Sequence, residues 1–337
     1  MAGALRLGVV GLVHDHVWNM LPQFAACGVQ PVAVVDANTP LTERARREFG
    51  YAHALPVLEG LWELRPDAVL YCGPNAGAAP VVEACAARGV HVLVEKPLAA
   101  TLGQARRIAT AAARGCVHVM CNWPTAWDPR VQHAAALARD GALGRVYTVR
   151  YRAAHSGPRE IGCSPYFWSW LYDAEQNGAG ALMDYCCYGA ALCAWLLGPP
   201  DTVTAVKGRL VKTDVPVDDN AVILMAYASA FGIAEASWTQ AGYRPYGLQV
   251  LGERAGLVAE GDALLRVDEE HPRGEPVAVP ELPAGARNPA EYFLSCLRED
   301  RAPEGLVSLE VGTLAQAILE AGLSAARTGQ AVRPGGL

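Results

Sequence analysis

The sequence predicts a two-domain α/β protein, with a parallel sheet in its first part and a mostly antiparallel sheet in its second part. Up to about residue 121, short apolar runs alternate with segments of helical periodicity, which is typical of βαβ units. Beyond residue 200, strand-like segments follow one another with short turns between them, as in an antiparallel meander. The length of 337 residues also suits two domains of ordinary size.

The first part is expected to form continuously apolar strands, because helices cover both faces of a parallel sheet. The strands are expected at residues 5–13, 31–36, around 54, 68–72, 90–94 and 117–121. The helices are expected at residues 17–27, 40–49, 78–88 and 102–114. We place the domain boundary near Asn122, which divides the chain into residues 1–121 and 122–337, because Pro124 and Pro129 punctuate the chain there.

The second part is expected to begin with a helix and a strand and to end with two helices. Strands are expected at residues 145–153, 203–211, 221–227, 233–239, 247–251 and 257–260. Helices are expected at residues 131–139, 289–298 and 309–327. Gly329 lies just past the last apolar position of the final helix, which is a common place for a helix to end.

Composition excludes several classes of protein. Hydrophobic residues make up 52% and charged residues 18% of the chain, which excludes a disordered protein. The net charge of −6 and the lack of a basic run argue against a nucleic-acid partner. We see no uninterrupted apolar stretch of the roughly 18 residues that a membrane span needs, and no signal-peptide pattern. A cytoplasmic location without membrane association is therefore expected.

The ten cysteines show no C-x-x-C pair. In a chain without export signals, we expect them to be small buried hydrophobic residues rather than disulfides or metal ligands. They are Cys27, Cys72, Cys85, Cys116, Cys121, Cys163, Cys186, Cys187, Cys193 and Cys296.

The first strand and turn carry a partial dinucleotide-binding pattern. Gly8 and Gly11 flank the strand end, and Asp36 closes the second strand. An acidic residue there accepts hydrogen bonds from a ribose and repels a 2′-phosphate, so it favours NAD over NADP. Val13 and His16 stand where the second and third glycines of G-x-G-x-x-G would be. These residues alone leave open a βα turn that binds no dinucleotide.

The segment Glu95-Lys96-Pro97 follows a predicted strand. Open α/β sheets place ligands at the carboxyl ends of their strands, and proline keeps the residue before it out of helical geometry. Lys96 would then reach the cleft as a fixed cation near a reacting oxygen. The alternative is an ordinary surface lysine after a strand.

A glycine-led helix carries a second polar pair. Asp184 and Tyr188 are four residues apart, so their side chains lie on one face of the helix that follows Gly180. A carboxylate beside a phenol can bind a hydroxyl substrate while the phenol exchanges a proton. A helix with a plain polar stripe would show the same spacing.

Together these motifs resemble the Gfo/Idh/MocA family of oxidoreductases (glucose–fructose oxidoreductase, inositol 2-dehydrogenase and rhizopine catabolism). The resemblance covers nearly the whole chain. Besides the first βα unit it includes Gly73-Pro74-Asn75, residues 89–97, residues 141–146, the helix at 180–188 and residues 312–321.

The resemblance implies an N-terminal Rossmann domain and a C-terminal α/β domain with a large open, mostly antiparallel sheet. That sheet would join a homodimer or homotetramer. It also implies an NAD-dependent oxidoreductase for a sugar, cyclitol or related polyol, with Lys96 beside the reacting carbon. The residues expected to bind the cofactor are Gly8, Gly11, Val13, His14, Asp36, Pro74, Asn75, Glu95 and Lys96.

The chain departs from the family's usual helix pattern, D-x-G-x-H-x-x-D. Cys186 replaces the glycine, Tyr188 the histidine and Ala191 the second acid. Members similar to dimeric dihydrodiol dehydrogenase carry tyrosine at that place and are thought to use it as the acid/base. Pro124 also stands where many members have an arginine.

We therefore expect Tyr188 to act as acid/base and Asp184 to orient the substrate. Lys96 is expected to polarise the substrate oxygen. Its charge is also expected to stabilise the phenolate of Tyr188 and to lower the pKa of that phenol below its usual value near 10.

Several further residues are candidates for the cleft. His14 and His16 have H-x-H spacing, but no third ligand is evident in the sequence, so no metal site is expected. His14 is expected near the pyrophosphate or the substrate. Trp123, His155 and Tyr166 are candidate substrate contacts, although core or loop positions are as common for such residues.

Two other functions stay open. The altered glycine pattern and the missing helix histidine would also fit a dinucleotide- or sugar-binding regulator that has lost catalysis. A metal-dependent lyase or hydrolase using His14 and His16 is the least favoured alternative.

Overall fold

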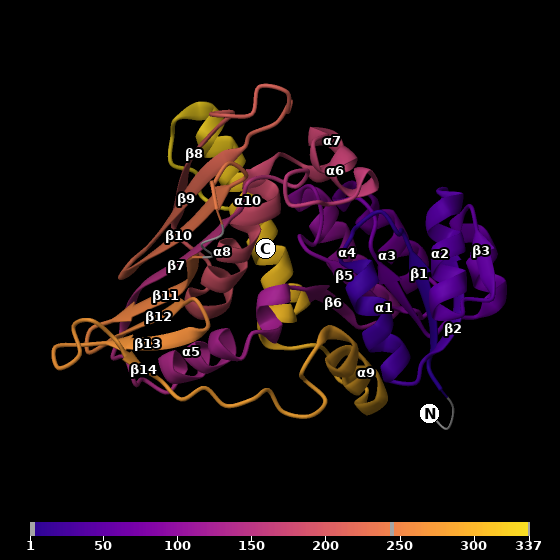
Figure 1. Ribbon diagram of the computed structural model, residues 1–337, viewed down its shortest axis with the longest axis horizontal. Coiled ribbons are helices and arrows are strands. Elements are labelled where there is room, and N and C mark those ends of the chain that lie inside the picture. Colours follow the sequence, from indigo (N-terminus) through magenta and orange to yellow (C-terminus); the bar gives the residue numbers. More distant parts are fainter. Residues whose placement is uncertain (1–3, 243–245, 336–337) are drawn as a thin grey trace.

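The structure is a computed structural model that describes residues 4–242 and 246–335. Its first part is a parallel sheet of six strands in the order β3-β2-β1-β4-β5-β6, the doubly wound arrangement that the sequence predicts (Figure 1). The strands are β1 (Arg6–Val10), β2 (Gln30–Val35), β3 (His53–Leu55), β4 (Ala68–Tyr71), β5 (His91–Glu95) and β6 (Val119–Asn122). Their carboxyl ends form one edge, where ligands bind in such sheets.

The predicted helices of the first part are confirmed within a few residues. They are α1 (Val17–Ala26), α2 (Thr39–Phe49), α3 (Ala78–Ala86) and α4 (Leu102–Gly115), with short 3-10 helices η1 (Leu58–Leu64) and η2 (Asn75–Gly77) between them. Helix α4 begins at a capping box in which Thr101 and Gln104 satisfy each other's amides. Strand β1 is shorter than the predicted 5–13, because the chain turns at Gly11.

The second part is a sheet of eight strands in the order β14-β13-β12-β11-β7-β10-β9-β8. The strands are β7 (Val146–Ala154), β8 (Thr202–Gly208), β9 (Asn220–Tyr227), β10 (Ala230–Ser237), β11 (Tyr246–Gly252), β12 (Gly256–Glu260), β13 (Ala263–Val267) and β14 (Glu275–Pro276). A simple meander is wrong in one respect: β7 lies between β10 and β11 and runs parallel to β10. Hydrophobic patterns predict strands but carry no information on which strand inserts between two others.

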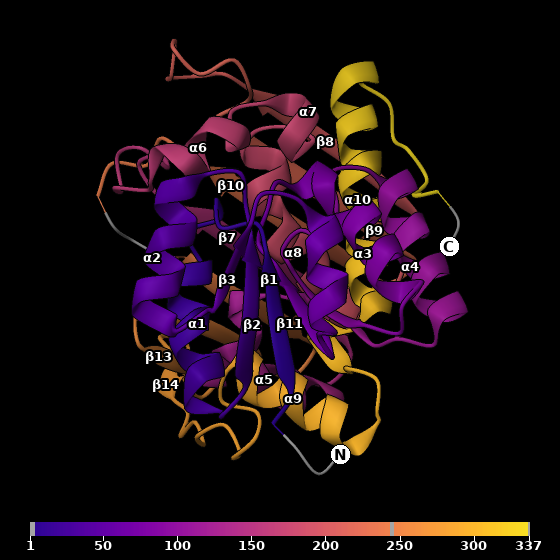
Figure 2. The ribbon, with the colours of Figure 1, turned by 90° about the vertical axis from the view of Figure 1, so that its right-hand side faces the viewer.

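The remaining helices lie on one face of this sheet or against the first part. They are η3 (Pro124–Trp127), α5 (Pro129–Arg139), α6 (Pro165–Leu171), α7 (Ala174–Asn177), α8 (Ala181–Leu197), α9 (Pro289–Glu299), η4 (Gly305–Val307) and α10 (Leu309–Thr328). Helices α8 and α10 pack on the inner face of the sheet, and α10 also contacts α4 of the first part (Figure 1). In the view of Figure 2, α9 lies beneath the first part, where it packs against α1.

Helix α8 is apolar on nearly all sides. The segment Ala174–Leu197 is long and apolar enough by composition to cross a membrane. It was not expected from the sequence, because polar residues interrupt its apolar run. Of its most apolar window, 78% is buried inside the protein, as in the core helix of a globular fold.

The cysteines form no disulfide among the described residues. Seven of them are buried as expected, but Cys27 and Cys163 are half-buried and Cys116 is exposed at the end of α4, so the expectation of burial is wrong for these three.

Candidate active site

The centre of the site is an ion pair between the end of β5 and helix α8. Lys96 directly follows β5, is only 2% exposed, and donates from Nζ to the Asp184 carboxylate at 2.6 Å and to the Asp184 carbonyl at 3.2 Å. Burial alone would lower the pKa of Lys96, but the adjacent carboxylate raises it above its usual value. Lys96 therefore carries a full charge in a nearly dry site, and it is not a surface lysine.

The packing around the start of α8 explains why residue 180 is a glycine. The carboxylate of Asp218 accepts hydrogen bonds from the amides of Gly180 (3.2 Å) and Leu182 (2.8 Å), which caps the helix. A Cβ atom at Gly180 would lie 2.1 Å from the Asp218 carbonyl oxygen. Farther along, Gly189 lets α8 press against Ala234 of β10. These two close approaches fix the rotation of α8 and thereby the direction of Asp184.

Asp184 and Tyr188 lie on one face of α8, as their spacing predicts. The second carboxylate oxygen of Asp184 accepts from the indole of Trp238 at 3.2 Å, so both oxygens have partners. The Lys96 ammonium lies 5.0 Å from the centre of the Tyr188 ring. Trp123 meets the same ring edge-on at 6.2 Å, which brings one predicted substrate residue to the site.

The expected lowering of the Tyr188 pKa is wrong. Burial raises the pKa of this phenol well above its usual value, and the neighbouring Cys187 and Asp184 add to this. Burial outweighs the favourable charge of the Lys96 ammonium, which is itself paired with Asp184. Tyr188 is therefore a neutral, proton-bearing phenol at ordinary pH.

Sequence reasoning missed Tyr185, a second phenol on the same turn of α8. Its ring lies 5.8 Å from the Lys96 ammonium and 6.0 Å from the Tyr188 ring, and its side chain is half-buried. Burial raises the pKa of Tyr185 as well, while Lys96 opposes the shift. Tyr185 and Tyr188 follow Asp184 by one and four positions, and both rings lie beside the Lys96 ammonium. The helical spacing that selects Tyr188 therefore does not exclude Tyr185.

His155 joins this group from the end of β7. Its ring contacts the Tyr185 ring edge-on at 4.7 Å, and its Nδ1 accepts from the Gly157 amide at 2.8 Å. The neutral ring therefore carries its proton on Nε2, which makes it a hydrogen-bond donor. Burial lowers the pKa of His155, although the charge of Asp184 opposes this. The structure thus brings His155 to the site, as the sequence suggested.

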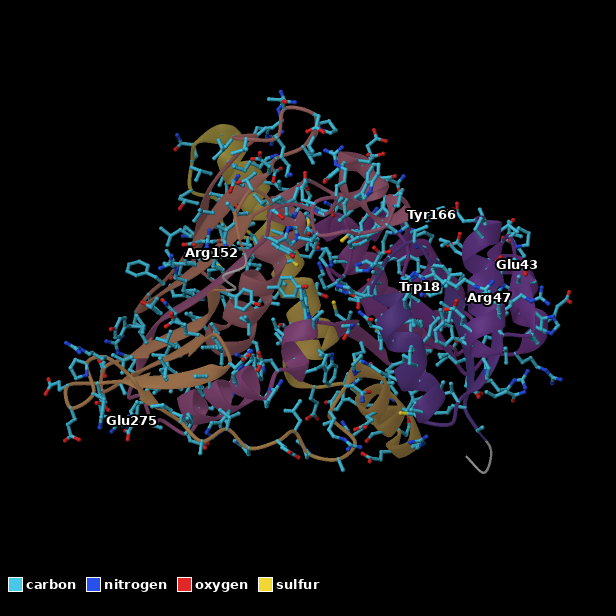
Figure 3. All side chains as sticks on the ribbon, in the orientation of Figure 1. Trp18, Glu43, Arg47, Arg152, Tyr166 and Glu275 are labelled. Carbon is cyan, nitrogen blue, oxygen red and sulfur yellow. The ribbon has the colours of Figure 1, made fainter. Side chains whose placement is uncertain are left out.

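Tyr166 is not brought to the Lys96 group. It is 36% exposed on α6, on the surface shown in Figure 3. Its neighbours Phe167 and Trp170 are buried instead, and their rings lie 4.4 Å and 5.7 Å from the ring of His14. The short aromatic helix α6 therefore covers the first turn with Phe167 and Trp170, which were not selected as substrate contacts from the sequence.

Glu95 is held by groups from three directions. One carboxylate oxygen accepts from the amide of Asn122, and the other lies 3.2 Å from Nδ1 of His16 and 3.1 Å from the Lys96 amide. The oxygen of the Asn122 side chain accepts in turn from the Trp127 indole at 2.8 Å. This network fixes the strand end from which Lys96 projects.

The first turn has the shape that a dinucleotide site requires at its β1–β2 side. Gly11 has φ +81°, and a Cβ there would lie 2.5 Å from the Gly73 nitrogen, so only glycine fits. Asp36 closes β2, where one oxygen accepts from the Leu12 amide at 2.6 Å and the other from the Asn38 amide at 2.7 Å. The second oxygen also accepts from the Asn38 side chain at 2.7 Å, so the oxygen bonded to Leu12 is the one that keeps a lone pair for a ribose hydroxyl, and these residues fit the group.

Other predicted cofactor contacts have structural partners. Gly8 lies inside β1, and Leu61 occupies the place of its missing side chain. The Asn75 amide donates to the Asn177 side chain at 2.8 Å, which links η2 to α7. The Pro74 carbonyl accepts from the Tyr71 hydroxyl at 2.6 Å. Val13 is half-buried on the turn itself.

His14 is the buried residue of the first turn. It is 1% exposed, and burial, followed by the charges of His16 and Lys96, lowers its pKa well below the usual value. Its Nε2 has no hydrogen-bond partner among the described residues. Next to it, Asp15 accepts from the Ser164 hydroxyl (2.6 Å) and amide (2.7 Å), which ties the turn to α6.

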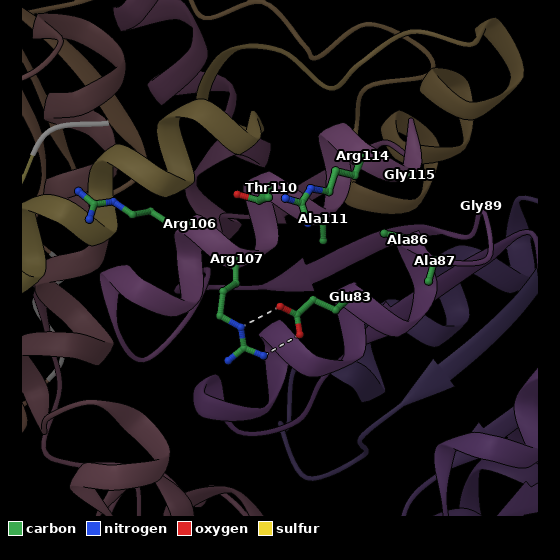
Figure 4. A pocket seen from close by; sticks show the side chains of 10 residues that line it. All are labelled: Glu83, Ala86, Ala87, Gly89, Arg106, Arg107, Thr110, Ala111, Arg114 and Gly115. Carbon is green, nitrogen blue, oxygen red and sulfur yellow. Dashed lines mark hydrogen bonds and ion pairs between the residues drawn. The ribbon is translucent and has the colours of Figure 1, made fainter.

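A depression elsewhere on the surface is not this site. It lies between α3 and α4 and contains Arg106, Arg107 and Arg114, with Arg107 paired to Glu83 at 2.6 Å (Figure 4). These residues lie on α3, on α4 and in the turns that precede β5 and β6. The depression is therefore at the amino ends of these strands, whereas Lys96 is at the carboxyl end of β5.

Two family models match the chain. Residues 5–139 match "Oxidoreductase family, NAD-binding Rossmann fold", and residues 131–258 match "GFO/IDH/MocA C-terminal domain". The chain belongs to the Gfo/Idh/MocA family. As a member, it is an oxidoreductase with an NAD(P)-binding Rossmann domain and a second domain built on a mixed, mostly antiparallel sheet.

Individual relatives agree with this assignment. D-Apiose dehydrogenase of Paraburkholderia graminis is 26% identical over 343 residues, covering 95% of this chain and 85% of that protein. Trans-1,2-dihydrobenzene-1,2-diol dehydrogenase of Bos taurus is 30% identical over 236 residues, 66% of this chain and 65% of that protein. The WlbA dehydrogenase from Bordetella pertussis, solved with NADH and UDP-GlcNAcA, has the same fold: TM-score 0.82, 22% identity, 99% and 100% coverage.

Proposed function

We propose that this Gfo/Idh/MocA oxidoreductase transfers a hydride between NAD and a secondary alcohol or carbonyl of a sugar, cyclitol or related polyol. The observation that carries the proposal is the buried Lys96–Asp184 pair with two phenols beside it. Such a group offers an ammonium, a carboxylate and a proton donor to one C–O bond. Relatives named for apiose and a dihydrodiol support a polyol substrate.

The nicotinamide, when bound, supplies the hydride chemistry, and the protein supplies orientation and charge. The Lys96 ammonium is placed to donate to the substrate oxygen, where negative charge develops as the hydride is gained or lost at carbon. Asp184 holds that ammonium in place. The residues of the first turn and Asp36 would hold the dinucleotide.

Tyr188 is the residue we assign to hold the moving proton. Its phenol is neutral at ordinary pH, so it donates a proton to the oxygen in carbonyl reduction and must accept one in alcohol oxidation. Because burial raises the pKa of this phenol, oxidation is the direction that alkaline conditions should assist. Tyr185 competes for the same role, and only substitution separates the two phenols.

The outer face of the second sheet supports a homodimer or homotetramer. Helices α8 and α10 cover the inner face, while Val206, Val222, Leu224 and Phe231 are exposed on the strands β8, β9 and β10. An apolar face of this kind is typical of an interface. We expect sedimentation velocity to give an oligomer for the wild type and a smaller species for Phe231→Glu; a monomeric wild type would refute this part of the proposal.

The proposed activity is tested by NAD reduction with a panel of aldoses, cyclitols and diols. We expect at least one polyol to support turnover, and NADH to reduce the corresponding carbonyl compound. Arg107→Met is the matched control, because Arg107 pairs with Glu83 in the depression at the opposite edge of the sheet. Loss of activity in Lys96→Met but not in Arg107→Met would locate the activity at the proposed site.

A second candidate is a regulator that binds a dinucleotide or sugar without turnover. Val13 and His16 replace two fingerprint glycines, and the His16 ring occupies a position against Glu95. Calorimetry that shows NAD binding, together with no turnover on any polyol, would favour this function.

A further inference from the structure

Three potential ligands converge between the first turn and the end of β5. His14 and His16 come from the turn before α1, and Glu95 is the last residue of β5. One ring nitrogen of each histidine and one oxygen of Glu95 all lie within 4.8 Å of one another. No third ligand for the H-x-H pair is evident in the sequence, because the residue that completes it lies 79 positions away from His16.

The spacing of these atoms suits a small divalent ion. Bonds of about 2.0–2.1 Å in a tetrahedral site place ligand atoms roughly 3.3–3.5 Å apart. The Glu95 oxygen lies 3.2 Å from Nδ1 of His16 and 3.9 Å from Nε2 of His14. An ion between them needs only small adjustments of the side chains.

An unpaired atom points to the same place. Nε2 of His14 is buried and has no hydrogen-bond partner among the described residues, although it lies beside the Glu95 carboxylate. Buried polar atoms in folded proteins are nearly always hydrogen-bonded or bound to a ligand, so such an atom calls for a ligand. His16, whose side chain is 34% exposed, provides the access that an entering ion requires.

The surroundings of Glu95 also suit a metal ligand. Its carboxylate is oriented by Asn122 and by the Lys96 amide, and Asn122 is in turn oriented by Trp127. Groups that orient a ligating carboxylate in this way are a regular part of metal sites.

We propose that His14, His16 and Glu95 bind a divalent transition-metal ion, with one coordination position left for an oxygen ligand. Two imidazoles and one carboxylate favour Zn²⁺ or a similar ion over Mg²⁺ or Ca²⁺, which prefer oxygen ligands. The site lies directly before Lys96 in the chain. The ion would therefore join the first turn to the strand end that carries the catalytic lysine.

The proposal has one structural cost. Nδ1 of His14 accepts from the His16 amide at 3.3 Å, so in the metal-free protein the ring proton resides on Nε2. An ion on Nε2 moves that proton to Nδ1, and this long hydrogen bond must open. The amide resonance of His16 should consequently shift when the ion binds.

The test is Zn²⁺ binding by the full-length protein, without dinucleotide or sugar. After dialysis against a chelator, the protein is titrated with Zn²⁺ in a calorimeter, and the retained metal is counted after gel filtration. We expect one ion per chain. Loss of groups that only orient a ligand costs about 10–100-fold in affinity, so removing a ligand in His16→Gln should cost at least about 100-fold.

A matched control separates this site from other histidine–carboxylate pairs. His118→Gln removes a histidine that pairs with Asp300 elsewhere on the surface, and it should bind Zn²⁺ like the wild type. Equal binding by wild type and His16→Gln, or no stoichiometric binding at all, would overturn the proposal. Because neither outcome involves turnover, failure here is distinct from failure of the proposed dehydrogenase activity.

Discussion

The end of β5 and the first turn meet at Glu95, but their polar groups are satisfied to different degrees. At the β5 end, Lys96 and both oxygens of Asp184 have partners, and Trp238 completes the group. At the first turn, the buried Nε2 of His14 has none among the described residues. The first region therefore has its polar groups paired within the protein, whereas the second leaves one buried nitrogen for the ion proposed above.

This difference predicts different consequences of substitution. Changes at the β5–α8 group should act on the rate of the chemical step, because its geometry is already set. Changes at the first turn should act on ligand affinity, on the choice of dinucleotide and on pH-dependent stability.

The largest effect is expected for Lys96→Met. We expect loss of measurable turnover with NAD affinity within a few fold of wild type, because the ammonium acts on an oxygen that becomes charged mainly in the transition state. Steady-state kinetics and a fluorescence titration with NADH measure the two quantities.

That substitution leaves Asp184 buried without its partner, which itself destabilises by about 3–5 kcal/mol. The double variant Lys96→Met with Asp184→Asn removes the unpaired charge and serves as the folding control. A folded variant that retains the wild-type kcat would show that Lys96 has no role in the reaction.

The next effect separates the two phenols. Tyr188→Phe should lower kcat/KM by about 10²–10⁴-fold, the usual contribution of a general acid or base, while Tyr185→Phe should lower it by less than about tenfold. Tyr188→His should recover part of the rate. The reverse order of the two Phe variants would assign the proton to Tyr185.

The pH profile of the wild type tests the same assignment. Because burial raises the pKa of Tyr188 above its usual value, the rate of alcohol oxidation should keep rising up to about pH 10 without a plateau. A plateau well below that pH, lost in Tyr188→Phe, would show that bound ligands lower the pKa of this phenol.

A smaller effect is expected at Asp36. NAD should bind more tightly than NADP, because a carboxylate faces the position of the 2′-phosphate. Unit charges 4 Å apart interact by about 1 kcal/mol in water, so Asp36→Asn should shift the NAD/NADP preference by roughly fivefold. Asparagine keeps an acceptor for the Leu12 amide. Tighter binding of NADP to the wild type would contradict the prediction.

The smallest effect is a dependence of stability on pH. The pKa of His14 is lowered on folding, so below about pH 6.5 the unfolded chain binds more protons than the folded one, and stability falls on acidification. One such group contributes at most about 1.4 kcal/mol per pH unit. Above that pH its contribution is constant.

Urea unfolding between pH 5 and 8, with a chelator present, measures this slope. His14→Phe keeps an aromatic ring against Phe167 and should reduce the slope, whereas the exposed His53→Gln should not. An unchanged slope in His14→Phe would assign the acid sensitivity to other groups, such as His155.

The sequence predicted the β5–α8 group better than the first turn, and the reason is physical. The end of a strand and a helical spacing are local patterns, and they were enough to predict that Lys96, Asp184 and Tyr188 lie in one site. The partners that complete each region are distant in the chain: Trp238 for Asp184, Asp218 for the start of α8, and Glu95 for the two histidines. Each pair forms only when its own domain folds, so no local pattern predicts it.

The helix α6 shows a second limit. Its seven residues are too few for a periodic pattern, and four of them are large aromatics that could lie in a core or an interface alike. The position of β7 between β10 and β11 could likewise not be predicted from the sequence, because the order of strands depends on the whole sheet.

The amide pair of Asn75 and Asn177 constrains how the protein can open. This pair is fully buried, whereas the other side-chain link described between the two domains near the first turn, Asp15 with Ser164, is half-buried. Breaking hydrogen bonds costs least where water can replace them. Separating the two domains near the first turn therefore costs less at the Asp15–Ser164 link than at the buried asparagine pair.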